Sequence, residues 1–465
     1  TSSLVGSEMC IRDRIYRMER CRILSQTEKL HFIGIGGIGM SALAQYALRC
    51  GIKVSGSDTA ENEQVKKLAA LGAKISIGHA RKNAKGADAV VYTSAISEDN
   101  PEYLFARDNQ KLLMKRAEFL RCVEQAHDLS VAVSGCHGKT TATAMLAHVF
   151  ACANKSATSL IGGEDSDYGN FTFGRDIFLT EACEYKRNFL YLTPDVAVIL
   201  NIDNDHLECY GDLDHLVGAY REFAAEGIAV VNADDENAVR AAGRNFVTFG
   251  MKNAAMYTCE DVRSEDGRYS FTLVEYGIRQ GRVRLKTEGR HNVYNALAAV
   301  AAARQCGVST AEAVRGVEDF KGVKRRWETI GELFGKKVIA DYAHHPKEIV
   351  SALSSVKNPL VIFQPHTYSR TKLLMKDFVA ALRGKTCVVY ATYPAREKYD
   401  AEGSAYTLYL ELKKAGGDAV YAEDEGRLLQ TVRLRAEAAD AVLALGAGDI
   451  YEVISRQIEK FGRKV

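Results

Sequence analysis

A glycine-rich turn between an apolar run and an alanine-rich run constrains this chain more than any other feature. Residues 129–134 are typical of a buried strand and residues 142–152 of a helix, with Gly135-Cys136-His137-Gly138-Lys139-Thr140-Thr141 between them. Strand, glycine turn and helix form the layout of a phosphate-binding loop, because the N–H groups and the dipole at a helix start favour an anion. The pattern predicts that Lys139 reaches the terminal phosphates of a nucleotide and that the Thr140 or Thr141 hydroxyl holds Mg²⁺.

Val133 stands where the usual pattern has its first glycine, so the loop is a short variant. A chance Gly-Lys-Thr sequence in a surface turn is the alternative interpretation. The strand and the helix lie where a phosphate loop requires them, which favours the loop.

Bulk properties narrow the class of protein. The length of 465 residues suggests about three domains. A net charge of +2 argues against a nucleic-acid partner, and the chain has no 18-residue apolar run, so no membrane association is expected. The eleven cysteines form no Cys-x-x-Cys pair, which indicates a reducing cytoplasm.

The pattern along the chain divides it into a tail and three domains. Residues 1–28 are interpreted as an N-terminal tail. Residues 7–14 resemble translated adapter sequence, so residues 1–17 are expected to be non-native; a native tail without function is the alternative. The expected domains are 29–125, 126–328 and 329–465. Strands alternate with helices in each, and residues 247–283 are expected to be antiparallel. The predicted class is therefore α/β, with a Rossmann-like N-terminal domain, a central P-loop ATPase domain and a Rossmann-like C-terminal domain.

A second glycine turn opens the first domain. Gly34-x-Gly36-x-x-Gly39 follows an apolar run, and Asp58 ends the next expected strand. Such a turn lets a diphosphate approach the backbone. Taken alone it would indicate NAD binding, and glycines that only form a tight turn are the other alternative.

Polar residues at strand ends supply candidate metal ligands. Glu181 follows one apolar run. His206 is the last residue of the Asn-Ile-Asp-Asn-Asp-His segment, which follows the next apolar run. A carboxylate beside a phosphate loop can ligate Mg²⁺, and His206 is a second candidate, with a solvated loop histidine as the alternative. Glu184 is expected to be solvated or to orient its neighbours.

Further candidates come from the second half of the chain. Asn292 is a plausible helix N-cap, and Asn295 lies three residues on, so both side chains can face one ligand. Arg326 lies in a basic linker, which is either a solvated segment or a source of charge for a transferring phosphate. Four polar residues follow expected strands of the third domain, where α/β proteins bind ligands; these are Asp341, His344, His366 and Arg370.

Together these segments resemble the Mur ligases, in the branch that adds alanine to UDP-N-acetylmuramate. The resemblance covers residues 30–456 and rests on the ordered set Gly-x-His-Gly-Lys-Thr-Thr, Asn-Ile-Asp-x-Asp-His, Gly-Arg-His-Asn-x-x-Asn, Lys-Arg-Arg, Asp-Tyr-x-His-His-Pro and Gln-Pro-His-Thr-Tyr-Ser-Arg-Thr. It implies an ATP-dependent ligase of peptidoglycan precursor synthesis, a monomer or weak homodimer, with UDP-N-acetylmuramate and L-alanine as substrates. It also implies that the C-terminal domain swings closed.

The resemblance assigns roles to residues, none of which composition or spacing shows. The implied UDP-sugar site contains Gly36, Gly37, Ile38, Gly39, Asp58 and Ser94. The implied ATP site contains Gly135, Cys136, His137, Gly138, Lys139, Thr140, Thr141, Asn292, Asn295, Arg326 and Asp341. Mg²⁺ would be held by Thr140, Glu181 and His206; catalysis would use Lys139, Arg326 and His206; and His344, His366 and Arg370 would lie near the sugar-acid and amino-acid ends.

Two departures from the family pattern stand out. The family commonly has Thr where Cys136 stands, and activity is expected to survive because the loop binds through its backbone. No lysine occurs between residues 207 and 227, where several Mur ligases carry a carbamylated lysine.

The implied mechanism activates the carboxylate as an acyl phosphate, which the alanine amine then attacks. Three other functions stay open from the residues. They are a recycling ligase that attaches a whole peptide to the same sugar, an NAD-dependent dehydrogenase and a nucleotide-gated regulatory protein without catalysis.

Overall fold

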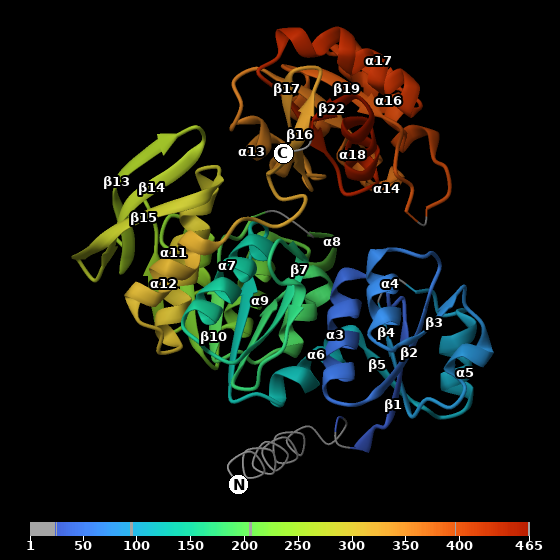
Figure 1. Ribbon diagram of the computed structural model, residues 1–465, viewed down its shortest axis with the longest axis vertical. Coiled ribbons are helices and arrows are strands. Elements are labelled where there is room, and N and C mark those ends of the chain that lie inside the picture. Colours follow the sequence, from blue (N-terminus) through green and yellow to red (C-terminus); the bar gives the residue numbers. More distant parts are fainter. Residues whose placement is uncertain (1–23, 25, 94–95, 204–206, 396, 464–465) are drawn as a thin grey trace. The chain divides into compact units, whose positions relative to one another are not determined.

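The described residues form three β-sheets in two compact units (Figure 1). Unit 1 reaches to Lys321, and unit 2 begins at Gly322. The computed structural model describes residues 24, 26–93, 96–203, 207–395 and 397–463. Each unit is described by itself below. Within the described ranges, no helix has the length and hydrophobicity needed to cross a membrane.

The first sheet is fully parallel, in the order β3-β2-β1-β4-β5. Its strands are β1 Lys29–Ile33, β2 Lys53–Asp58, β3 Lys74–Ile77, β4 Ala89–Tyr92 and β5 Leu112–Lys115. The helical segments that connect them are α3 Ile38–Arg49, α4 Glu63–Ala70, η1 Arg81–Ala84, α5 Pro101–Asp108 and α6 Arg116–Gln125. The order is that of a Rossmann-like sheet, so the glycine turn after β1 lies at the carboxyl edge, where such sheets bind nucleotides.

The second sheet has the order β15-β14-β13-β12-β11-β10-β6-β9-β7-β8. Its strands are β6 Leu129–Ser134, β7 Ala157–Asp165, β8 Gly169–Thr172, β9 Ile177–Glu181, β10 Val196–Ile199, β11 Ile228–Asn232, β12 Phe246–Phe249, β13 Tyr257–Glu265, β14 Arg268–Glu275 and β15 Ile278–Glu288. Strands β13, β14 and β15 pair antiparallel, as residues 247–283 were expected to, whereas β12 pairs parallel with both neighbours. Strand β6 lies between β10 and β9, so the ends of two other strands flank the loop that follows it.

Helices cover this second sheet. They are α7 Lys139–Cys152, η2 Tyr185–Tyr191, α8 Leu207–Tyr210, α9 Leu213–Phe223, α10 Glu236–Ala241, α11 His291–Gln305 and α12 Thr310–Asp319. Helix α7 is apolar around most of its circumference, because it packs under α11 and α12 as well as on the sheet. Because close packing surrounds α7, its N-terminus is held in one position.

Unit 2 holds the third sheet, in the order β20-β19-β18-β21-β17-β16-β22. Its strands are β16 Glu328–Leu333, β17 Lys336–Asp341, β18 Pro359–Phe363, β19 Thr386–Tyr390, β20 Ala419–Ala422, β21 Ala441–Leu445 and β22 Gly462–Arg463. Its helices are α13 Pro346–Leu353, α14 Tyr368–Leu373, α15 Met375–Leu382, η3 Ala401–Gly403, α16 Ala405–Lys414, α17 Glu425–Arg435, η4 Ala436–Ala438 and α18 Ile450–Phe461. Apolar clusters pack on both faces of the sheet, which is what a doubly wound fold requires.

The predicted three-domain α/β class is thus confirmed. The exact boundaries 29–125, 126–328 and 329–465 stay a prediction. The antiparallel strands β8, β16 and β22, which lie at or next to sheet edges, were not expected from the sequence.

Candidate functional site

The loop between β6 and α7 is shaped by its own backbone and clamped by a neighbouring strand end. Gly138 has a φ of 87° at the helix N-cap, and a Cβ there would lie 2.8 Å from Asn295 Oδ1. Asn201, just after β10, accepts a hydrogen bond from the His137 N–H at 2.9 Å and donates one to the His137 carbonyl at 3.0 Å. The Cys136 N–H donates to the Asn201 carbonyl at 3.2 Å. These contacts fix the loop from the β10 side.

Lys139 is paired with a buried carboxylate. Its ammonium donates to the two Glu184 carboxylate oxygens at 3.1 and 3.0 Å and to the Gly135 carbonyl at 2.5 Å. Glu184 was expected to be solvated or to orient its neighbours. Its side chain is only 1% exposed and contacts Lys139, so the structure supports the orienting alternative. Burial alone would lower the pKa of the Lys139 ammonium, but the adjacent Glu184 carboxylate raises it above its ordinary value. Lys139 is therefore a fixed positive charge at the phosphate loop.

Two of the three predicted metal ligands lie at the edges of this loop. Glu181 ends β9, is the register partner of Val133 on β6, and accepts the Gly162 N–H at 2.6 Å. Thr140 is buried in the first turn of α7. A carboxylate and a hydroxyl are oxygen donors that suit Mg²⁺.

The third predicted ligand, His206, lies outside the described residues. Among the residues that are described, no group of three or more His, Cys, Asp and Glu side chains has a metal-binding arrangement. The set Thr140, Glu181 and His206 therefore stays a prediction.

Asn292 and Asn295 are joined on the inner face of α11. Asn295 donates to Asn292 Oδ1 at 3.0 Å, and Asn292 donates to the Glu288 carbonyl at 2.7 Å. The predicted N-cap role of Asn292 was wrong, because the helix begins at His291 with Arg290 as its N-cap. Asn292 instead holds Asn295, whose carbonyl faces Gly138 of the phosphate loop.

The glycine turn of the first domain is braced from the end of β2. The Gly34 and Ile35 N–H groups donate to the Ser57 carbonyl at 2.8 and 3.0 Å, and the Gly36 N–H donates to Asp58 Oδ2 at 2.8 Å. Asp58 thus supports the turn in this structure. The turn leads directly into α3, whose first N–H groups, on Ile38 and Gly39, have no acceptor within the helix by its geometry.

A cationic side chain lies beside the N-terminus of α3. The Arg116 guanidinium lies 3.4 Å from the position that a Cβ would take on Gly39. A helix N-terminus and a guanidinium together form a good environment for a diphosphate. Ser94, the remaining residue predicted for this site, lies outside the described residues.

Unit 2 brings together the polar residues predicted at its strand ends. The Arg326 guanidinium stacks on the Tyr342 ring with 4.8 Å to the centroid, and Arg325 stacks on the same ring at 5.0 Å. Asp341 accepts the Trp327 N–H at 2.8 Å and the Ala343 N–H at 2.9 Å. Burial raises the pKa of the Asp341 carboxyl, against the opposing effect of Arg326.

His344, His366 and Arg370 form one cluster in the same unit. The His344 and His366 rings have centroids 5.9 Å apart, and the Arg370 guanidinium donates to the His366 carbonyl at 2.8 Å. Burial lowers the pKa of His344, and it lowers that of His366 to about 4. Both rings are therefore neutral at physiological pH and can donate or accept a hydrogen bond.

Sequence reasoning assigned no role to Asn201 and Arg116, and it did not identify Glu184 as the partner of Lys139. Asn201 and Glu184 both stand within three residues of a strand end, the position that had already singled out Glu181. Arg116 begins the helix that follows β5. A search for every polar residue next to a predicted strand end would have found all three.

Comparison with known proteins covers nearly the whole chain. Three family profiles match: Mur ligase family, catalytic domain, over residues 29–127; Mur ligase middle domain over 133–303; and Mur ligase, glutamate ligase domain, over 325–448. The UDP-N-acetylmuramate–L-alanine ligase of Clostridium tetani is 39% identical over 444 residues, which are 92% of this chain and 97% of that one.

Solved structures show the same relation. The UDP-N-acetylmuramate–alanine ligase of Thermotoga maritima has a TM-score of 0.79 and 32% identity, covering 93% of this chain and 98% of that one. A murein peptide ligase from Psychrobacter arcticus covers the same shares with a TM-score of 0.70, but at 23% identity it shares the fold only.

Proposed function

This chain belongs to the Mur ligase family, and we propose that it joins L-alanine to the carboxylate of UDP-N-acetylmuramate with ATP, in peptidoglycan precursor synthesis. The observation that carries the proposal is the 39% sequence identity, over 92% of this chain, to a UDP-N-acetylmuramate–L-alanine ligase. Lys139, half-buried at the start of α7 after a loop between two strand ends, supplies a positive charge of the kind that such a ligase needs.

The reaction needs an activated carboxylate, because a carboxylate is a poor electrophile. The terminal phosphoryl group of ATP passes to a carboxylate oxygen, which gives an acyl phosphate and ADP. The alanine nitrogen then attacks the carbonyl carbon, the bond from that carbon to the phosphate oxygen breaks, and the amine loses a proton. Catalysis of such transfers rests on positioning and on stabilising negative charge.

The phosphate loop would meet that charge. The N-terminus of α7 and the Lys139 ammonium favour phosphate oxygens, while Asn295 closes the loop from α11. Thr140 and Glu181, with His206, would hold Mg²⁺, which when bound neutralises phosphate charge.

The remaining parts of the substrates are assigned to residues on the same chemical grounds. The N-terminus of α3 and Arg116 would bind the UDP diphosphate. In unit 2, Arg326 would stabilise the transferring phosphoryl group, and His344, His366 and Arg370 would bind the sugar acid and the amino acid.

A coupled ADP-release assay tests the function. We expect ADP release to require both UDP-N-acetylmuramate and L-alanine, and equal release without an amino acid would contradict the proposal. Replacing alanine with the tripeptide separates this activity from that of a peptide-recycling ligase. Lys139→Ala should lose at least about 100-fold in turnover while still binding the UDP-sugar, since it removes the charge beside the transferred group.

A further inference from the structure

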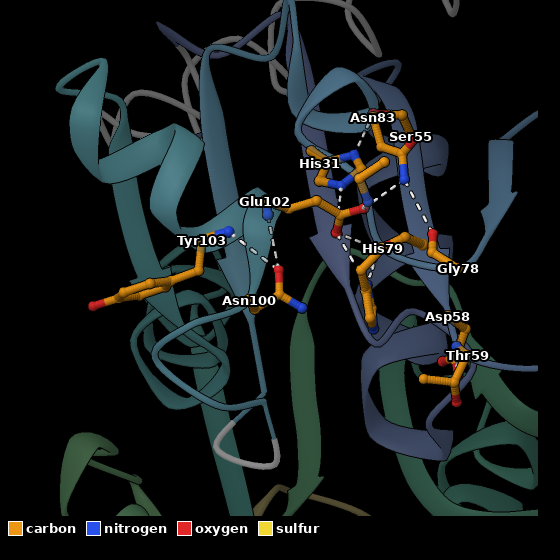
Figure 2. A network of polar contacts seen from close by, with 12 residues as sticks. His31, Ser55, Asp58, Thr59, Gly78, His79, Asn83, Asn100, Glu102 and Tyr103 are labelled. Carbon is orange, nitrogen blue, oxygen red and sulfur yellow. Dashed lines mark hydrogen bonds and ion pairs between the residues drawn. The ribbon is translucent and has the colours of Figure 1, made fainter.

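A buried carboxylate lies beneath the glycine turn of the first domain, outside the sites described above (Figure 2). Glu102 is the second residue of α5 and its side chain has no exposed surface. Asn100 caps the same helix by accepting the Glu102 and Tyr103 N–H groups at 2.9 and 3.2 Å. The cap and the helix dipole both favour a negative charge at this position.

Strands β1 and β2 and the segment after β3 all supply hydrogen-bond donors to Glu102. The Oε2 atom contacts Ser57 Oγ of β2 at 2.5 Å, His79 Nδ1 at 3.3 Å and His31 Nε2 of β1 at 3.5 Å. The Oε1 atom accepts the Ala80 N–H at 3.2 Å and the Asn83 side-chain amide at 2.5 Å. Figure 2 shows His31, His79 and Asn83 around the Glu102 carboxylate.

The charge on Glu102 is stabilised by these donors. Burial alone would raise the pKa of its carboxyl, but the hydrogen bonds from His31, Ser57 and Asn83 lower the pKa to about 2. A buried charge of this kind is a weak source of net stability, and geometric precision is the better-supported reason to retain one.

Ser57 connects the carboxylate to the glycine turn. Its side chain is held by Glu102, while its carbonyl accepts the N–H groups of Gly34 and Ile35. The next residue, Asp58, accepts the Gly36 N–H through its side chain and the Gly78 N–H through its carbonyl. The turn is thus held by residues 57 and 58 at the end of β2. Pairing with β1 and β3 places the Ser57 backbone, and Glu102 fixes the Ser57 side chain.

We propose that Glu102 is a positioning residue for the UDP-sugar site: through Ser57 it holds the glycine turn so that the first N–H groups of α3 meet the diphosphate. The proposal rests on the proposed function. The Glu102 side chain has no exposed surface, so a direct contact with a bound ligand is not expected. The most direct connection from Glu102 to the turn is its hydrogen bond to Ser57, and that bond can be tested by removing either partner.

The test is a double-mutant cycle of Glu102→Gln and Ser57→Ala in the full chain, with KM measured separately for each substrate. Gln keeps the size of the side chain but puts an amide N–H where the carboxylate accepts hydrogen bonds. We expect each single variant to raise KM for UDP-N-acetylmuramate about tenfold, because ångström-scale misplacement of binding groups has effects of this order or larger. KM for ATP and for alanine should change less than about twofold.

The double variant should be no worse than the poorer single variant, because both substitutions break the same link. Additive effects, or equal increases in KM for all three substrates, would overturn the proposal. Titration of UDP-N-acetylmuramate by calorimetry, well below the melting temperature of each variant, separates weak binding from partial unfolding.

Glu124→Gln is the matched control. Glu124 is another buried glutamate of the same unit, but its carboxylate accepts the Thr193 N–H and does not touch the glycine turn. Its KM values should match those of the wild type. If the wild-type chain itself binds no UDP-N-acetylmuramate, the proposed function fails; if it binds and the Glu102 and Ser57 variants bind equally well, only this inference fails.

Discussion

Replacing Glu184 by Gln tests whether Lys139 is held in place by its buried partner. The ammonium and the carboxylate lie 3.0 Å apart, with 17% and 1% of their side chains exposed. At an effective dielectric constant of about 20, two unit charges at that distance attract by about 5.5 kcal/mol. Removing one partner from a buried pair has a net effect of about 3–5 kcal/mol, and the lower end applies because water reaches Lys139.

A loss of about 3 kcal/mol should lower the melting temperature by about 4–5 °C, because the entropy of unfolding is about 2.1 cal/mol/K per residue and the unit reaches to Lys321. Nucleotide should reverse part of that loss, because a phosphate supplies the negative charge that Glu184 no longer provides. The assay is calorimetric melting of the full chain with and without Mg²⁺ and ADP. The rise in melting temperature caused by nucleotide should be larger for Glu184→Gln than for the wild type.

Glu222→Gln is the control for this experiment. Glu222 pairs with Arg187 on the surface, where its side chain is 62% exposed, so its loss should hardly change melting. The reasoning is refuted if Glu184→Gln melts like the wild type without nucleotide. It is also refuted if the melting temperature falls by the same amount in the presence of Mg²⁺ and ADP.

Two further predictions concern the metal and pH. Gly162→Ala places a Cβ 2.5 Å from both Glu181 carboxylate oxygens, so the carboxylate must move. We expect the Mg²⁺ concentration for half-maximal activity to rise about tenfold. An unchanged Mg²⁺ titration would contradict Glu181 as a ligand. Burial raises the pKa of Glu124 from 4.5 to about 7. Because the folded state then holds a proton that the unfolded state has lost, Glu124 should reduce the free energy of unfolding as pH rises from about 4.5 to 7, by up to about 1.4 kcal/mol per unit. Urea unfolding across that range should show the slope in the wild type and a weaker one in Glu124→Gln.

The sequence predicted those parts of the fold and site that depend on local order along the chain. The two glycine turns follow strands and open helices as expected, at Gly34–Gly39 and Gly135–Gly138, because strand, turn and helix are each encoded within a few residues. The antiparallel strands β13–β15 were also predicted from their alternation. Asn295 was singled out for its spacing from Asn292, and its contact with Gly138 follows from the packing of α11.

Contacts between distant segments could not be predicted in this way. The partner of Lys139 stands 45 residues further on, after a strand end where no period fixes the direction of the side chain. The hydrogen bond between His31 and Glu102 spans 71 residues. Asn292 looked like an N-cap because Asn is common there, and only the observed helix start at His291 shows that it lies inside the helix.

The two glycine loops proposed to bind nucleotides are both held by side chains from behind and present backbone N–H groups in front, with a consequence for how such an enzyme evolves. At Gly34–Gly39 and at Gly135–Gly138, the side chains of Asp58 and Asn201 hold the loop from behind. The surface left for phosphate at the helix starts is made largely of peptide N–H groups, which every residue except proline carries alike. Most single codon changes leave these N–H groups in place, except those that introduce proline or put a side chain where Gly138 leaves no room. Descendants of this chain that join a different amino acid would therefore be expected to keep both loops and to differ in the side chains that face the new substrate.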